Sequence, residues 1–172
     1  MSYISALAML FRLLLALCFL AVQPGITKAK IVDRVVAYVG YDAITYVDLT
    51  EFIEKMHKKG IDIKPREAVK TLVNRLIFIK EARRLRLQAS NNDALIQKYI
   101  DIKIKPFVFI KDEEVLAYYK EHIDVFKDRP FEQLREEITR VLFEKKLNRA
   151  IKEHLKKLKR SYDVVIIKDA LN

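Results

Sequence analysis

The segment from Pro130 to Arg160 constrains the fold more than any other part of the sequence. After Pro130 it contains neither glycine nor proline, and its apolar residues recur at intervals of three and four, the spacing of one helix face. About 30 helical residues extend about 45 Å. A small domain cannot cover such a helix along its whole length, so we expect it either to wrap around the other elements or to offer part of its apolar face to a partner. One slip, between Leu142 and Leu147, interrupts the spacing.

The same segment carries most of the net positive charge. The 172 residues include 33 Lys and Arg against 23 Asp and Glu, a formal charge of +10. From Arg140 to Arg160, nine bases face only Glu144 and Glu153, a local charge of +7. Such a helix can bind acidic protein, anionic lipid or nucleic acid, or it can be a solvated face opposite the apolar stripe. The candidate basic surface is Lys145, Lys146, Arg149, Lys152, Lys156 and Lys157.

The first 29 residues are typical of an export signal. Their apolar run from Leu13 to Val22 has ten residues, which suits the core of a signal peptide and is too short to span a bilayer about 30 Å thick. We predict cleavage after Ala29 and a periplasmic mature protein of residues 30–172. The alternative is an uncleaved anchor from Ile4 to Val22, which would tether the protein to the inner membrane.

Export changes the composition of the functional chain. Cleavage removes Cys18, which is the only cysteine, together with Arg12 and Lys28, so the mature chain is thiol-free and carries a charge of +8. This excludes disulfides, thiol catalysis and thiolate metal sites, and the domain depends on core packing alone. Nucleic acid is not an expected partner outside the cytoplasm.

Strand patterns stand at both ends of the mature chain. Ile31 to Val39 is rich in β-branched residues and ends at Gly40, which predicts a strand and a turn, and Ala43-Ile44 can return as a very short strand. Tyr162 to Ile167 repeats the strand pattern. We expect the two terminal strands to pair, because a lone strand leaves its backbone groups without partners.

Helices are expected between these strands. Thr45 and Asp48 form the acidic variant of a capping box, which predicts a helix start at this point. Three further helices are expected at Pro65–Leu85, at about Asn92–Ile104 and at Asp112–Ile123. The predicted fold is therefore mainly α, a helical module with paired N-terminal and C-terminal strands and one long C-terminal helix.

Residue types that carry chemistry are scarce. Glycine occurs at only three positions, none of them in a nucleotide-binding spacing. The three histidines, His57, His122 and His154, are far apart, and we predict solvated surface residues rather than metal ligands. Acidic pairs such as Glu113 and Glu114 stand at helix starts, where the helix dipole explains them. We predict no catalytic residue, no metal and no cofactor.

Aromatic residues gather around the helix break at Pro106. They either fill the core between helices or form an exposed apolar surface for client proteins. The candidate client-binding residues are Phe107, Phe109, Tyr118 and Tyr119.

Four segments resemble, in the same order, the N-terminal domain of SurA-type periplasmic chaperones. They are VDRVVAYVGYDAITYVDL at 32–49, LVNRLI at 72–77 with Glu81-Ala82, DEEV at 112–115 with Tyr118-Tyr119, and PFEQLREEI at 130–138. The likeness spans about residues 31–167. The chain departs from the family at Gly40-Tyr41, where the family usually has Asn-Asp, and at residues 126–129, where the family usually carries parvulin-type prolyl isomerase domains.

The resemblance implies a chaperone module without isomerase activity. We expect an exported holdase that binds unfolded or partly folded envelope proteins, among them outer-membrane proteins, without ATP or metal. Its basic helix would hold acidic clients or lie near an anionic membrane surface. The alternative is a membrane-associated structural or adaptor domain with one fixed partner. The sequence leaves the oligomeric state open, including a domain-swapped dimer that exchanges the long helix.

Overall fold

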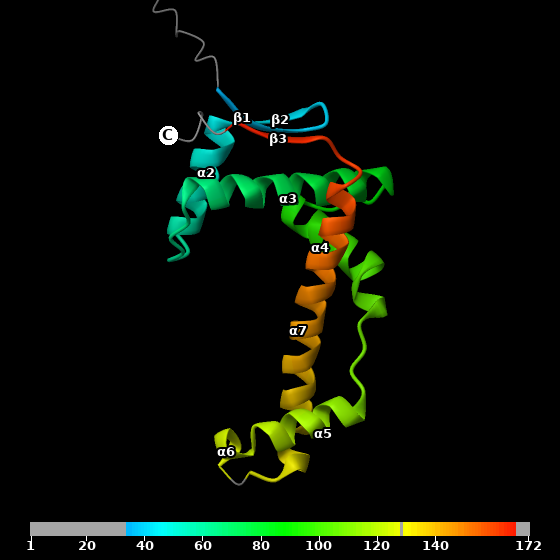
Figure 1. The fold of residues 1–172 in the computed structure, drawn as a ribbon. Helices are drawn as coiled ribbons and strands as arrows, with labels where there is room; N and C mark the ends of the chain where they lie inside the picture. Colours follow the sequence, from blue (N-terminus) through cyan, green and yellow to red (C-terminus); the bar gives the residue numbers. More distant parts are fainter. Residues whose placement is uncertain (1–33, 128, 168–172) are drawn as a thin grey trace, which may run out of the picture. The chain divides into compact units, whose positions relative to one another are not determined.

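The computed structural model describes residues 34–127 and 129–167, and Figure 1 shows their arrangement. The structure is mainly helical, with 68% helix, a small three-stranded antiparallel sheet and a long C-terminal helix. The predicted fold class is therefore confirmed. The predicted signal segment, with its cleavage site at Ala29 and its alternative as an anchor, lies outside the described residues and stays a prediction.

The sheet joins the two ends of the described chain. Strand β1 (Val35–Val39) lies between β2 (Asp42–Thr45) and β3 (Val164–Ile166), and both pairings are antiparallel. Ala37, Tyr38 and Val39 each pair on both sides; Tyr38, for example, pairs with Ala43 of β2 and with Val165 of β3. Gly40 turns the chain between β1 and β2 with a φ of +61°, a conformation that glycine adopts without strain. The predicted pairing of the terminal strands is confirmed.

Helix α2 (Tyr46–His57) begins directly after β2. The side-chain oxygen of Thr45 accepts from the backbone N–H of Asp48 at 3.2 Å, and the Asp48 carboxylate accepts from the backbone N–H of Thr45 at 2.8 Å. These reciprocal bonds are the predicted capping box, which satisfies backbone donors that a helix start leaves without partners.

Two adjoining core clusters hold the sheet and the first helices together. Helix α3 (Pro65–Arg84) and helix α4 (Asn92–Lys103) begin at the predicted residues. One cluster contains nine buried residues of the sheet, α2 and α3 up to Ile77, including Val36. The other contains seven buried residues of α3, α4 and Ile104, including Tyr99. Leu155 and Leu158 of the C-terminal helix pack against both clusters.

A third, smaller cluster lies at the other end of the long helix. It forms beyond the short 3-10 helix η1 (Lys105–Phe107), where α5 (Asp112–Glu121) and α6 (Ile123–Phe126) follow. The prediction of one helix through Ile123 is wrong, because α5 ends at Glu121. There the His122 ring stacks on Tyr118 and its Nδ1 donates to the Tyr118 carbonyl oxygen at 2.9 Å.

The long helix α7 (Phe131–Lys159) has 29 residues and contributes to all three clusters. In its first half Leu134, Ile138 and Leu142 pack with α5 and α6. In its second half Leu147, Ile151 and Leu155 pack on α3 and α4. At about 100° per residue, these two sets lie on faces turned by roughly 140° from each other. The slip between Leu142 and Leu147 therefore marks the point where α7 changes its buried face. None of the described helices is both long enough and apolar enough to cross a bilayer.

Candidate functional site

Phe107 and Phe109 are exposed where the chain passes from η1 to α5. Their side chains are 76% and 66% exposed, although an aromatic ring stabilises a folded chain most when it is buried. The intervening Val108 is half-buried. The two phenylalanines that the sequence offered as client-binding residues thus form an exposed aromatic pair.

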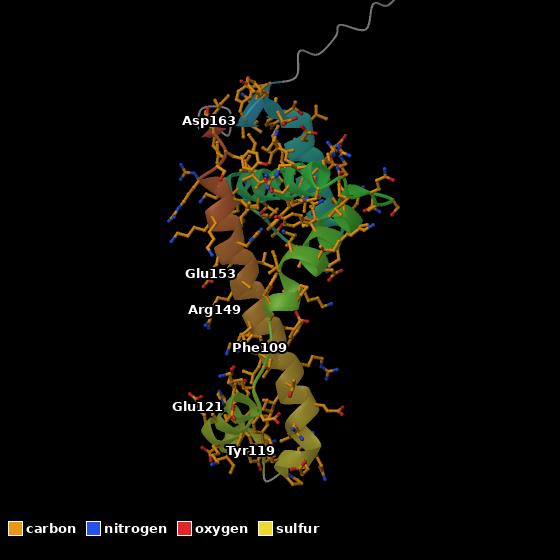
Figure 2. The ribbon with its side chains drawn as sticks, turned by 90° about the vertical axis from the view of Figure 1, so that its right-hand side faces the viewer. Phe109, Tyr119, Glu121, Arg149, Glu153 and Asp163 are labelled. Atoms are coloured by element: carbon orange, nitrogen blue, oxygen red, sulfur yellow. The ribbon has the colours of Figure 1, made fainter. Side chains whose placement is uncertain are left out.

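The aromatic pair lies against the long basic helix. Residues 107–109 and four residues of α7 line a shallow, open depression. The α7 residues are Lys146, Arg149, Ala150 and Glu153. In Figure 2, Arg149 and Glu153 project from the same side of α7, and Phe109 lies farther along the helix toward α5. The structure therefore brings together two sets that the sequence analysis treated separately, the aromatic candidates and part of the basic surface.

Lys146 ties the segment after η1 to α7. Its Nζ donates to the Phe109 carbonyl oxygen at 3.0 Å and to the Glu114 carboxylate at 2.8 Å, and it lies 5.7 Å from the centre of the Phe109 ring. The hydrogen bond from Lys146 is the main cause that lowers the pKa of the Glu114 carboxyl. Lys146 is therefore engaged within the chain, and it positions Phe109 rather than offering a free charge.

Tyr118 and Tyr119, the other two client-binding candidates, lie in the small cluster on α5. Both are half-buried and pack against its core of Val115, Leu134 and Ile138. The Tyr119 ring stacks on Phe126 with ring centres 5.7 Å apart, and its hydroxyl donates to the Arg129 carbonyl oxygen at 2.8 Å. These contacts give the two tyrosines a structural role that Phe107 and Phe109 do not have.

The candidate basic residues separate into a row and two outliers. Lys145, Arg149, Lys152 and Lys156 recur at intervals of four, three and four along α7 and share one face. Lys159, outside the predicted set, extends this face by one more turn. We call these five exposed residues the basic stripe: Lys145, Arg149, Lys152, Lys156 and Lys159. Lys146 turns toward Glu114, and Lys157 lies about 100° away from its neighbour in the stripe.

The charges of the basic stripe have no acidic partner within the described part of the chain. In residues 34–127 and 129–167, none of the five takes part in an ion pair. Lys145 lies 5.7 Å from the centre of the Tyr118 ring, at the end of the stripe that faces α5. The intervals of three and four were the signal in the sequence that could have separated the stripe from Lys146 and Lys157 and added Lys159.

A second open surface lies between the sheet, α2 and α3. This cleft has a volume of about 420 Å³. Its apolar lining consists of Ala43, Ile44, Phe52, Leu72, Leu76 and Ile79. At its polar side Lys55 and Arg75 both bind the carboxylate of Asp93, and the hydrogen bond from Arg75, followed by that from Lys55, lowers the pKa of this carboxyl. The sequence analysis predicted a short strand at Ala43 and Ile44 and did not identify the cleft.

The most buried charged group of the described chain is structural. Glu81 is 5% exposed and accepts hydrogen bonds from Arg84 Nη2 and from the Tyr162 hydroxyl, both at 2.7 Å. Burial, together with the hydrogen bond to Glu81, raises the pKa of Tyr162 to about 12. These bonds fasten the segment between α7 and β3 to α3, and they satisfy a carboxylate that would otherwise be costly to bury.

The prediction of a solvated His154 is wrong. Its Nε2 lies 2.8 Å from the hydroxyl of the buried Tyr99, and its partial burial lowers the pKa of the imidazole. His122 is also half-buried, whereas His57 is exposed as predicted. Among the described residues no group of three His, Cys, Asp or Glu could hold a metal ion.

Comparison with known proteins assigns no relative. No family model matches the chain, and no curated protein matches it at a significant level. The resemblance to SurA-type chaperones therefore rests on the four sequence segments quoted above, and it stays a prediction.

Proposed function

We propose that the protein is an exported, ATP-independent chaperone module, a holdase that binds unfolded or partly folded envelope proteins through apolar surface. The observation that carries this proposal is the exposed aromatic pair, Phe107 and Phe109, beside a depression on α7. Exposed aromatic side chains in a cluster are typical of a surface that binds other proteins. Unfolded chains present the apolar side chains that such a surface can cover.

Two further features support a binding role for the chain. The cleft between the sheet, α2 and α3 adds a second apolar surface that opens to solvent. Strand β2 stands at the edge of the sheet and contributes Ala43 and Ile44 to this cleft. An extended client segment can pair with such an edge while its side chains enter the cleft. Phe126 and Phe131 are separated by only four residues, so the chain has no parvulin-sized insertion there, and we propose no isomerase activity.

An aggregation assay with several unrelated unfolded proteins, including an outer-membrane protein, tests the proposal. Light scattering after dilution from denaturant should rise more slowly when the native chain is present. A variant with Phe107→Ser and Phe109→Ser should lose most of this protection. The matched control is Tyr41→Ser with Val125→Ser, because these two side chains are also highly exposed, at 105% and 71%, and lie outside both apolar surfaces.

The outcome also separates a holdase from an adaptor. Failure of the native chain to delay the aggregation of any of these proteins overturns the holdase proposal. Equal protection by the native chain and the Phe107/Phe109 variant removes the aromatic pair as the site. A single partner held tightly in a pull-down, with no effect on unfolded proteins, would favour the adaptor or structural domain.

A further inference from the structure

The basic stripe is a straight row of like charges on one side of α7. Its five members span 15 residues, and the 14 steps from Lys145 to Lys159 correspond to about 21 Å along the helix. Glu144 and Glu153, the two acids of this helix half, flank the stripe at roughly a quarter turn from its centre line, and Glu153 stands on the same side of α7 as Arg149 (Figure 2). All five side chains are exposed. The stripe therefore concentrates positive charge along a line rather than around a pocket.

The exposure of the stripe follows from the change of buried face in α7. Ile138 and Lys145 are seven residues apart, as are Leu142 and Arg149, so each pair lies on nearly the same side of the helix. The apolar members of these pairs pack in the small cluster with α5 and α6. After Lys145 the same side carries cations, while the opposite side of α7 packs on α3 and α4. A like-charged row without ion pairs costs repulsion within the helix, and an anionic partner would relieve it.

We propose that the basic stripe docks the protein on the surface of a bilayer that contains anionic phospholipids. Four of the five cations are lysines, which act as point charges and do not need the paired geometry of a specific carboxylate site. A line of four to eight such charges on an amphipathic helix is a known pattern for attraction to anionic headgroups. This inference does not rest on the holdase proposal, although Phe107 and Phe109 border both surfaces.

Two features favour a membrane over an acidic protein as the partner. Phe107 and Phe109 are exposed to one side of the stripe, next to Arg149, and aromatic rings beside cations suit the boundary between headgroups and acyl chains. The sequence also contains the apolar run from Leu13 to Val22, which we expect to direct the chain to a membrane. The stripe would then hold the folded domain against the same membrane to which the apolar run directs the chain.

A fluorescent label beside the stripe tests the docking in the full chain. Asn148→Cys with Cys18→Ser places a single polarity-sensitive label on an exposed neighbour of the stripe without removing a charge. Vesicles of phosphatidylcholine with phosphatidylglycerol should shift its emission, whereas vesicles of phosphatidylcholine alone should not. The shift should weaken as salt is added, because salt screens exposed charges. Ser90→Cys with Cys18→Ser, in the turn between α3 and α4, is the control label and should respond to neither. Because each label reports only on its own surroundings, insertion of the apolar N-terminal run into the vesicle would not by itself shift the emission at position 148.

Charge variants decide whether the stripe itself is responsible. Replacing Lys145, Arg149, Lys152 and Lys156 by Gln should weaken the vesicle-dependent shift at least about a hundredfold in lipid concentration. The matched control replaces four exposed lysines elsewhere by Gln and has the same net charge; they are Lys58, Lys59, Lys64 and Lys70. Gln keeps the helix propensity close to that of Lys, and circular dichroism verifies the fold. Equal losses in both variants, or no response at position 148, overturn the proposal. A response at position 148 to polyglutamate but not to anionic vesicles overturns it in favour of an acidic protein partner.

Discussion

The two ends of α7 lie in very different surroundings. Near Leu155 and Leu158 the helix packs where two clusters with nine and seven buried residues adjoin. Near Leu134 and Ile138 it packs into a cluster whose only other fully buried member, among the described residues, is Val115. The C-terminal end also has the hydrogen bond from Tyr162 to Glu81, whereas the N-terminal end is held by aromatic rings and exposed ion pairs.

This difference teaches that one continuous helix can belong to two regions of unequal stability. Local opening costs least where few apolar residues are buried and most backbone is near solvent. We therefore expect the end cluster of α5, α6 and the first half of α7 to open while the sheet, α3 and α4 stay folded. Five predictions test this difference in stability between the two ends of α7.

The largest loss of stability is expected for a truncation in the sheet-side core. Ile77 is 0% exposed and belongs to the cluster that joins the sheet, α2 and α3. Ile77→Ala should lower the free energy of global unfolding by about 2–5 kcal/mol, because it removes buried methylene groups and leaves a cavity. Urea denaturation followed by circular dichroism measures the loss. Val125→Ala, at a side chain that is 71% exposed, is the control and should change stability by less than about 0.5 kcal/mol.

A truncation of similar size in the end cluster should act only locally. Leu134 is also 0% exposed, so Leu134→Ala should destabilise its surroundings by about 2–4 kcal/mol. Hydrogen exchange should accelerate at the amides of α5 and leave those of β1 unchanged, and the main unfolding transition should move little. Acceleration of β1 and α5 to the same extent would contradict the independence of the two regions.

A smaller loss of stability is expected when the hydrogen bond between Tyr162 and Glu81 is removed. Tyr162→Phe removes the hydroxyl that donates to Glu81 and leaves a buried carboxylate with one partner fewer. The expected cost is about 1–3 kcal/mol in global stability. Chemical denaturation measures it, and Tyr41→Phe, at a fully exposed ring, provides a matched control that should have no effect.

Much of this fold could be predicted from the sequence because local chemistry and the final structure agree. The capping residues Thr45 and Asp48, the turn at Gly40 and the uninterrupted helix after Pro130 each have one favourable local conformation, and the structure adopts it. The break after Glu121 was not predictable in this way. At His122 the backbone leaves the helical conformation, with φ −119° and ψ 24°, and neither glycine nor proline marks this point in the sequence.

The candidate site could be predicted only in part. Phe107, Phe109, Tyr118 and Tyr119 come from one aromatic-rich stretch of sequence. The two tyrosines are half-buried because they pack against Leu134 and Ile138 of α7, whereas the two phenylalanines stay exposed, and the sequence does not show this difference. The slip after Leu142 indicated that the apolar face of α7 changes along the helix. It did not indicate that α5 and α6 cover one side of α7 only in its first half, which leaves the basic stripe exposed on that side in the second half. The position of His154 was missed because its partner Tyr99 is 55 residues away in the sequence.

Acidification should weaken the C-terminal region of α7 through His154. Burial lowers the pKa of its imidazole in the folded chain below the ordinary value of 6.5, so the unfolded chain takes up the proton first as the pH falls. The stability that His154 contributes is therefore fully present above about pH 6.5 and is lost as the pH falls toward the folded-state pKa. Denaturation curves at several pH values should show a flatter dependence for His154→Gln. A slope identical to that of the native chain would assign the acid sensitivity to other groups.

The smallest effect is expected at Lys146, which links the segment between η1 and α5 to α7. Lys146→Met removes the hydrogen bonds to Glu114 and to the Phe109 carbonyl oxygen while keeping the length of the side chain. Because this ion pair is partly exposed, the loss should be about 0.2–1 kcal/mol, and it should appear as faster hydrogen exchange at the start of α5 rather than as a lower global stability. Glu114→Gln should reproduce most of it, and the double variant should add little. Lys152→Met removes an exposed charge of the same helix that has no ion pair among the described residues, and it should leave α5 unchanged. If both lysine variants accelerated hydrogen exchange in α5 equally, the net charge of α7, and not the hydrogen bonds of Lys146, would stabilise the segment around Phe109.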